Sequence, residues 1–219
     1  DVYKRQAIGI YRIARTLDRK AQIVINEITT SVQPLIDMFQ NSQEYEPDMF
    51  LKSQQALETA GNNTVLVVVD VNKPSITECP ELLKVCKSIV VLDHHRQGTE
   101  TIENATLSYV EAYASSTCEM VSEILQYIND GVRIKGEEAD CMYSGIMIDT
   151  NNFMTKTGVR TFEAAAWLRS RGAETAATKS LFNISKEEYE ARAAIVEGAY
   201  LYKGCAIATS DELDPAMSV

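Results

Sequence analysis

The 219-residue sequence has no apolar stretch of the length that a transmembrane helix requires. A spanning helix needs about 20 consecutive apolar residues, whereas the longest run here is Val65–Val69. No secretory signal peptide is visible either. We therefore expect this piece of chain to be soluble.

Cysteine pairs of the C-x-x-C type are absent, and the five cysteines are scattered along the chain. An odd number at such spacing argues against a disulfide framework and indicates reduced thiols in a cytosolic protein. A structural zinc site has no ligand pattern either. The cysteines are Cys79, Cys86, Cys118, Cys141 and Cys205.

Basic residues are the minority among the charged ones, with 21 Lys and Arg against 31 Asp and Glu and a net charge of −10. This balance excludes a broad basic surface for duplex nucleic acid. A small phosphorylated substrate stays compatible with it if metal ions supply positive charge locally. The length and the hydrophobic content of 45% predict one substantial core with little left for a complete second domain.

Continuous apolar runs alternate with segments of helical periodicity, which favours an α/β fold with a parallel sheet flanked by helices on both faces. Strands are predicted at residues 23–25, 64–69, 89–92, 107–110 and 204–209. Helices are predicted at residues 7–16, 30–40, 47–59, 80–86, 116–129, 137–149, 160–171 and 186–202. Ser115, Ser116 and Thr117 are all candidate caps for the helix that begins near residue 116.

Two of the apolar strands are each followed by an aspartate. Asp70 ends the first and Asp93 the second. A lone aspartate in this position is more often a loop residue or a helix cap. Because ligands of open α/β sheets bind beyond the carboxyl ends of the strands, the repeated placement indicates a site.

The only two histidines, His94 and His95, directly follow Asp93. Imidazole and carboxylate together suit Mn²⁺, Fe²⁺ or Zn²⁺. Asp149 ends a helix of otherwise apolar character, where a carboxylate faces the negative end of the helix dipole. A metal ion would remove that penalty, although the residue alone could equally begin the polar loop 150–152.

The segment Leu92-Asp93-His94-His95-Arg96 resembles the signature of the DHH phosphoesterases. Supporting segments are residues 69–74, 113–121, 149–153 and 157–165. Over residues 7–214 the combination is similar to the membrane-anchored cyclic-di-AMP phosphodiesterases of Gram-positive bacteria. Pyrophosphatases, exonucleases and nanoRNases share the DHH core, but segments 72–74 and 150–153 favour the cyclic dinucleotide branch.

The resemblance implies a site with two Mn²⁺ ions. Asp70 would bridge both ions, and His94 and Asp149 would complete the shell of one. His95 would face the substrate phosphate as a catalytic and substrate-binding residue, and Asp93 would orient a histidine. A metal-bound hydroxide would then cleave cyclic-di-AMP to linear pApA.

Thr117 and Arg160 are weaker candidates for substrate contacts. Helix capping is the alternative role for Thr117, and surface solvation is the alternative for Arg160.

The chain departs from the family at Asp1–Gln6, where the first metal-binding motif is expected and does not match. We expect these six residues to be a non-native leader. Residues 7–184 would form the catalytic domain, 185–203 a connector helix, and 204–219 the start of a truncated DHHA1 domain. Such a fragment would bind one metal weakly and hydrolyse the diester slowly or not at all.

Two alternatives stay open from the sequence. The chain could be another DHH phosphoesterase, an oligoribonuclease or a pyrophosphatase, or it could be a non-catalytic nucleotide-binding domain. By resemblance the parent protein would be anchored in the cell membrane with a cytoplasmic catalytic domain. A homodimer is left open.

Overall fold

The computed structural model describes residues 4–29, 32–128, 131–180 and 186–209. The chain divides into two compact units, Asp1–Leu181 and Phe182–Val219. The first unit is an α/β domain, and the described part of the second consists of a helix and a β-hairpin.

The centre of the first unit is a three-stranded parallel sheet in the order β3-β4-β5. The strands are β3 (Val65–Val69), β4 (Ser88–Asp93) and β5 (Leu107–Val110). Val69 lies opposite Leu92, so the carboxyl ends of β3 and β4 are level with each other. The predicted parallel sheet is confirmed.

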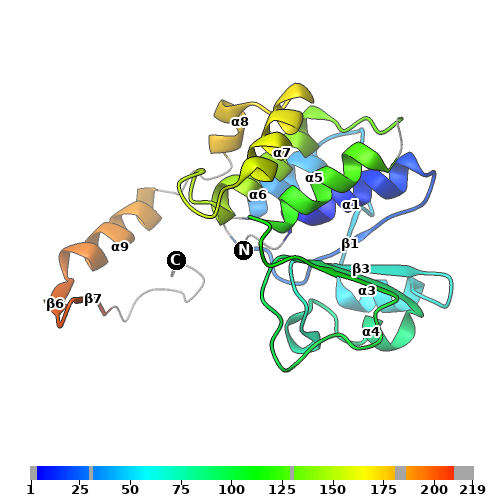
Figure 1. Cartoon of the computed structure of the whole chain (residues 1–219), viewed down its shortest axis with the longest axis horizontal. Helices are drawn as coiled ribbons and strands as arrows, with labels where there is room; N and C mark the ends of the chain where they lie inside the picture. Colours follow the sequence, from blue (N-terminus) through cyan, green and yellow to red (C-terminus); the bar gives the residue numbers. More distant parts are fainter. Residues whose placement is uncertain (1–3, 30–31, 129–130, 181–185, 210–219) are drawn as a thin grey trace. The chain divides into compact units, whose positions relative to one another are not determined.

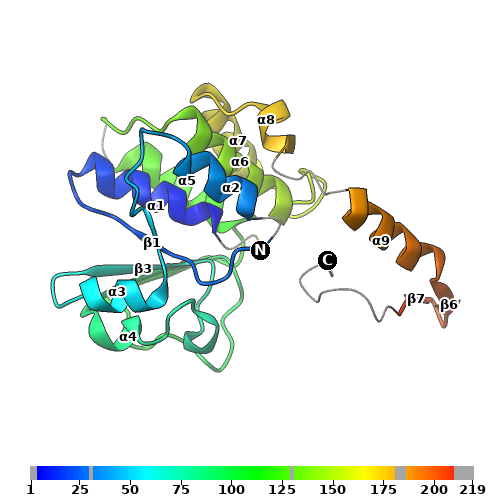
Figure 2. The same cartoon turned by 180° about the vertical axis from the view of Figure 1, so that it is seen from behind.

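Helices cover both faces of this sheet (Figures 1 and 2). One face carries α1 (Arg5–Thr16), α5 (Thr117–Tyr127), α6 (Gly136–Asp149) and α7 (Val159–Ser170). The opposite face carries α3 (Ser53–Thr59) and α4 (Leu82–Val85). Short helices are η1 (Pro74–Ile76) and α8 (Thr175–Ser180). Alternate residues of the strands enter the two cores, as strands buried on both faces require.

A second small sheet pairs β1 (Ile23–Val24) in parallel with β2 (Phe50–Leu51), beside α2 (Gln33–Gln40). The helix predicted over residues 47–59 is therefore wrong in its first half. The Ile25 amide donates to the Leu51 carbonyl at 2.9 Å. This pairing holds the segment extended, so α3 begins only at Ser53.

Helix α1 runs antiparallel to α6. Its first residue, Arg5, lies against Gly145 near the end of α6. Arg12, further along α1, pairs with Glu138 near the start of α6. A Cβ on Gly145 would lie 2.3 Å from the Cys118 Sγ of α5, so only glycine permits this approach. The close packing brings the last residue of α6 beside the first turn of α5.

The second unit contains α9 (Lys186–Glu197) and an antiparallel hairpin of β6 (Tyr200–Tyr202) and β7 (Cys205–Ile207). The helix predicted over residues 186–202 thus ends earlier, at Glu197. Lys203 and Gly204 both have positive φ, at 49° and 81°, and form the two-residue turn typical of hairpins. In the described parts of the chain, no helix is long and apolar enough to span a membrane.

The expected domain boundaries stay predictions. Of the expected leader, residues 1–3 lie outside the described part, whereas Arg5 and Gln6 are buried in the first turn of α1.

Candidate metal centre

Asp70 is the first residue after β3, and its carboxylate is buried with 1% exposure. Its amide donates to the Leu92 carbonyl at 2.8 Å, and its φ of 65° is in the left-handed region that L-residues seldom adopt. Thr117 at the start of α5 donates its hydroxyl to Oδ1 at 2.6 Å. Oδ2 is buried and has no hydrogen-bond partner among the described residues. The structure thus fixes this carboxylate but leaves one oxygen unmatched.

His94 and Asp149 converge on Asp70 from other elements. His94 Nε2 lies 3.6 Å from Asp70 Oδ1 and 4.0 Å from Asp149 Oδ2. Both distances are too long for hydrogen bonds. Within the described chain, His94 Nε2 and Asp149 Oδ2 are also buried without a partner.

Burial and mutual repulsion disturb the protonation of these groups. Burial, and then the neighbouring Asp70, raise the pKa of Asp149 to about 7. Burial lowers the pKa of His94, which keeps its imidazole neutral at neutral pH. A cation binds a neutral imidazole and ionised carboxylates, and its positive charge would offset the repulsion between the two carboxylates.

A divalent cation fits this arrangement. Native proteins seldom leave buried polar atoms unsatisfied, yet Asp70, His94 and Asp149 each have one such atom, and His94 Nε2 lies within 4.0 Å of a carboxylate oxygen of each aspartate. Two carboxylates and an imidazole form a donor set suited to Mn²⁺ or Fe²⁺. Ligand atoms of Asp70, His94 and His95 also lie within 4.8 Å of one another.

His95 is held by Asp93, the buried last residue of β4. Its Nδ1 lies 2.7 Å from Asp93 Oδ1, and this hydrogen bond is the main cause that raises the pKa of His95. The other oxygen, Oδ2, accepts from Asn72 Nδ2 at 2.6 Å. The sequence reasoning assigned no contact to Asn72. Its position three residues beyond the end of β3, near the level where Asp93 ends β4, is the signal that could have found it.

Thr117 and Arg160 occupy different places. Ser116 is the N-cap of α5, accepting from the Glu119 amide at 3.0 Å, which leaves the Thr117 hydroxyl for Asp70. Arg160 on α7 donates two hydrogen bonds to Glu123, both at 2.7 Å. Glu123 raises the pKa of Arg160 further, so the guanidinium stays charged. A substrate contact by either residue remains a prediction.

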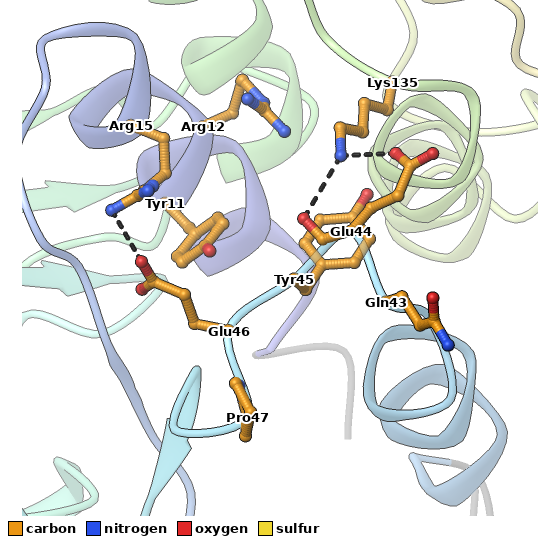
Figure 3. Close-up of a pocket in the computed structure, with 9 residues that line it drawn as sticks. All are labelled: Tyr11, Arg12, Arg15, Gln43, Glu44, Tyr45, Glu46, Pro47 and Lys135. Carbon is orange, nitrogen blue, oxygen red and sulfur yellow. Dashed lines mark hydrogen bonds and ion pairs between the residues drawn. The ribbon is translucent and has the colours of Figure 1, made fainter.

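A cavity of about 400 Å³ lies elsewhere, at the far end of α6. Figure 3 shows its lining residues, which are Tyr11, Arg12, Arg15, Gln43, Glu44, Tyr45, Glu46, Pro47 and Lys135. Lys135 caps the start of α6 and Asp149 ends it, which separates the cavity from the metal centre by about 20 Å of helix.

Each cation of the cavity has a carboxylate partner. Arg15 pairs with Glu46 and Lys135 pairs with Glu44, as the dashed lines of Figure 3 show. Arg12 donates two hydrogen bonds to the buried Glu138, both at 2.7 Å. Charge is therefore balanced there, and none of the predicted site residues lines this cavity.

The family model for the DHH family, N-terminal domain, matches residues 7–146. That match includes Asp70, Asp93, His94 and His95, which the fold brings to one edge of the sheet. The chain belongs to the DHH family. The resemblance predicted from the Asp93-His94-His95 segment is confirmed.

Curated relatives extend the comparison of this DHH domain. It is 39% identical over 199 residues to the cyclic-di-AMP phosphodiesterase GdpP of Bacillus subtilis, covering 90% of this chain and 30% of that protein. It is 37% identical over 210 residues to the cyclic-di-AMP phosphodiesterase PdeA of Listeria monocytogenes, covering 94% and 32%. The chain thus spans about a third of the length of these relatives.

Two more distant relatives are informative. A probable manganese-dependent inorganic pyrophosphatase of Thermotoga maritima is 33% identical over 92 residues, which covers 42% of this chain and 16% of that protein. An exopolyphosphatase-related protein of Bacteroides fragilis superposes with a TM-score of 0.74 at 17% identity, covering 91% of this chain and 58% of that one. The second likeness shows the α/β fold.

Proposed function

We propose that this DHH domain is the catalytic core of a manganese-dependent phosphodiesterase that hydrolyses cyclic-di-AMP to linear pApA. The observation that carries the proposal is that His94 Nε2 lies within 4.0 Å of a carboxylate oxygen of both Asp70 and Asp149. Each of these three side chains has one buried atom without a hydrogen-bond partner among the described residues. The relatives supply the substrate class, since the proteins of Bacillus subtilis and Listeria monocytogenes, which match at least 90% of the chain, are cyclic-di-AMP phosphodiesterases.

Asp70, His94 and Asp149 would hold the metal. A divalent cation held there would supply an activated water and would stabilise negative charge on a phosphoryl group. The Thr117 hydroxyl keeps the Asp70 carboxylate in one orientation, because it donates to Oδ1 and leaves Oδ2 for the metal.

His95 would act on the phosphate. Its raised pKa favours the imidazolium near neutral pH, and an imidazolium can donate a proton or a hydrogen bond to a phosphate oxygen. Asp93 fixes the ring through Nδ1, and Asn72 in turn fixes Asp93 through Oδ2. The chain Asn72–Asp93–His95 therefore orients the catalytic ring.

We further infer that this chain holds one cation weakly and turns over slowly. In the described part of the chain, the ligand atoms form a single group around Asp70 and the two histidines. A second ion would share Asp70 and need further carboxylates. Membrane anchoring of the parent protein and a homodimer stay predictions.

Hydrolysis by the Mn²⁺-loaded chain tests the proposal. We expect slow, Mn²⁺-dependent release of pApA from cyclic-di-AMP, with slower hydrolysis of pApA and of pyrophosphate. Asp70→Asn should abolish it, whereas Asp18→Asn, which alters an exposed acid after α1, should leave it unchanged. Preference for pyrophosphate, or turnover that survives Asp70→Asn, would refute the proposal. Metal-dependent binding without turnover would instead assign a nucleotide-binding domain.

A further inference from the structure

The loop that follows Asp149 has an unusual backbone. Asn151, Asn152 and Phe153 are three consecutive residues with positive φ, at 46°, 55° and 63°. Asparagine tolerates this region, but a bulky aromatic residue seldom adopts it. Such strain persists only where the surroundings impose it, and it concentrates at functional sites. Here the Phe153 amide donates to the Thr150 hydroxyl at 3.0 Å.

The turn presents Phe153 to a second aromatic ring. The rings of Phe153 and Phe162 are stacked, with centroids 5.8 Å apart and an interplanar angle of 23°. Tyr143 packs against Phe153 at 5.7 Å, so Phe153 is held between two rings. Phe162 is nevertheless 55% exposed, and Val159, three residues earlier on α7, is exposed as well. The ring of Phe162 is therefore exposed to solvent, and its contact with Phe153 fixes its orientation.

Two connections tie this ring pair to the metal centre. Phe153 follows Asp149 by only four residues. Thr161, beside Phe162, donates its hydroxyl at 2.7 Å to the buried Glu119, which lies in the first turn of α5. The same turn supplies the Thr117 hydroxyl to Asp70. The ring pair thus lies on the elements that build the site.

We propose that Phe162, supported by Phe153, is a stacking platform for a nucleobase of a phosphoester bound at the metal centre. Every nucleobase has a π-face, so a platform of this kind selects nucleotides over phosphates without a base. The inference deepens the proposed function and rests on it for the position of the phosphate. Tyr113 is even more exposed, at 96%, but no ring contact that the structure describes orients its side chain.

Binding of two simple phosphates to the Mn²⁺-loaded chain tests the platform. AMP and ribose 5-phosphate share the sugar phosphate and differ in the base. We expect AMP to bind about 10-fold more tightly, the contribution of one stacked base. Phe162→Ala should reduce the affinity for AMP to that for ribose 5-phosphate and leave the latter unchanged. Phe162→Trp should retain the difference.

Tyr127→Ala is the matched control, because Tyr127 is an exposed aromatic residue at the opposite end of α5. Equal affinities of the unaltered chain for the two ligands, or an unchanged difference in Phe162→Ala, would overturn the platform. Mn²⁺-dependent binding of ribose 5-phosphate that Asp70→Asn abolishes would then still support the metal centre. Absence of Mn²⁺-dependent binding of both ligands would contradict the platform and the proposed function together.

Discussion

The two ends of the α1–α6 pair bury charged side chains in opposite ways. At the Asp149 end, Asp70, His94 and Asp149 bring together buried atoms that have no partner in the described chain. At the opposite end, Arg12 and Glu138 are joined by two hydrogen bonds of 2.7 Å. Both ends contain ionisable groups, but the buried Arg12–Glu138 pair satisfies its own charges, whereas Asp70, His94 and Asp149 form no hydrogen bonds with one another.

This difference distinguishes the cavity near Arg12 from the candidate metal centre. Each cation of the 400 Å³ cavity already has a carboxylate partner. Two buried polar atoms at the cavity have no hydrogen-bond partner among the described residues, the hydroxyl of Tyr45 and Oε2 of Glu46. The pKa of Tyr45 is raised mainly by burial. The candidate metal centre has three such atoms, on two carboxylates and an imidazole. The proposed function therefore rests on these unmatched ligand atoms and not on the volume of a cavity.

The largest effect is expected on the free energy of unfolding, when the buried Arg12–Glu138 pair is broken. Glu138→Ala leaves the Arg12 guanidinium, which is mostly buried, without its partner. Loss of one partner of a buried pair costs about 3–5 kcal/mol in the free energy of unfolding. Urea denaturation measures it, and Mn²⁺ affinity of the folded variant should be unchanged. A loss in metal affinity instead would mean that the two ends are not independent.

The next largest effect is expected on Mn²⁺ affinity, when Asp70 of the candidate metal centre is changed. Asp70→Asn removes a metal ligand that already has one oxygen held by Thr117. Substitutions one layer outside a metal shell cost about 10–100-fold in affinity, so we expect a loss of about 100-fold or more here. Calorimetric titration with Mn²⁺ measures this. The unfolding free energy without metal should not fall, since Asp70→Asn relieves repulsion with Asp149, and a marked destabilisation would contradict the account.

The pH dependence of metal binding sharpens the comparison. Because the pKa of Asp149 is raised to about 7, its carboxyl is protonated below that pH in the metal-free protein. A cation must displace this proton, so Mn²⁺ affinity should fall about tenfold per pH unit below pH 7 and level off above it. Titrations at pH 5.5, 6.5 and 8 measure the slope.

Asp149→Asn is the control for this slope. It should bind Mn²⁺ more weakly at pH 8 but lose the dependence that Asp149 contributes. A slope that persists unchanged in this variant would assign the proton to another group, with His95 as the first candidate because Asp93 raises its pKa.

The smallest effect is expected for the exposed pair of the cavity. Arg15 and Glu46 lie 3.0 Å apart, and both side chains are 36% exposed. Solvent screens such a pair, so Arg15→Met should change the unfolding free energy by about 0.5 kcal/mol or less and leave Mn²⁺ affinity unaltered. A change of several kcal/mol would contradict the expectation that solvent screens the Arg15–Glu46 pair.

Much of the site follows from the sequence because its signals are local. Asp70 and Asp93 end apolar strands, and parallel strands place such residues on one edge. Asp149 ends an apolar helix, and the two histidines adjoin Asp93. These positions needed only strand and helix periodicity, and the structure places carboxylate oxygens of Asp70 and Asp149 at 3.6 Å and 4.0 Å from His94 Nε2.

What the sequence could not show depends on three-dimensional pairing. The Asn72–Asp93 hydrogen bond arises from the register of β3 against β4. The Phe153–Phe162 stack requires a positive φ at Phe153, which an aromatic residue type does not indicate. The strands β2 and β6 are two and three residues long, too short to show an alternating pattern. The helices predicted over residues 47–59 and 186–202 therefore included these two strands.

The central claim is that the unmatched atoms at the carboxyl edge of the sheet are metal ligands. Anomalous scattering from crystals grown with Mn²⁺ tests it most directly, because the signal locates the ion itself. The account predicts a peak bounded by the side chains of Asp70, His94 and Asp149. A peak in the cavity near Arg12, or no bound ion at saturating Mn²⁺, would contradict it.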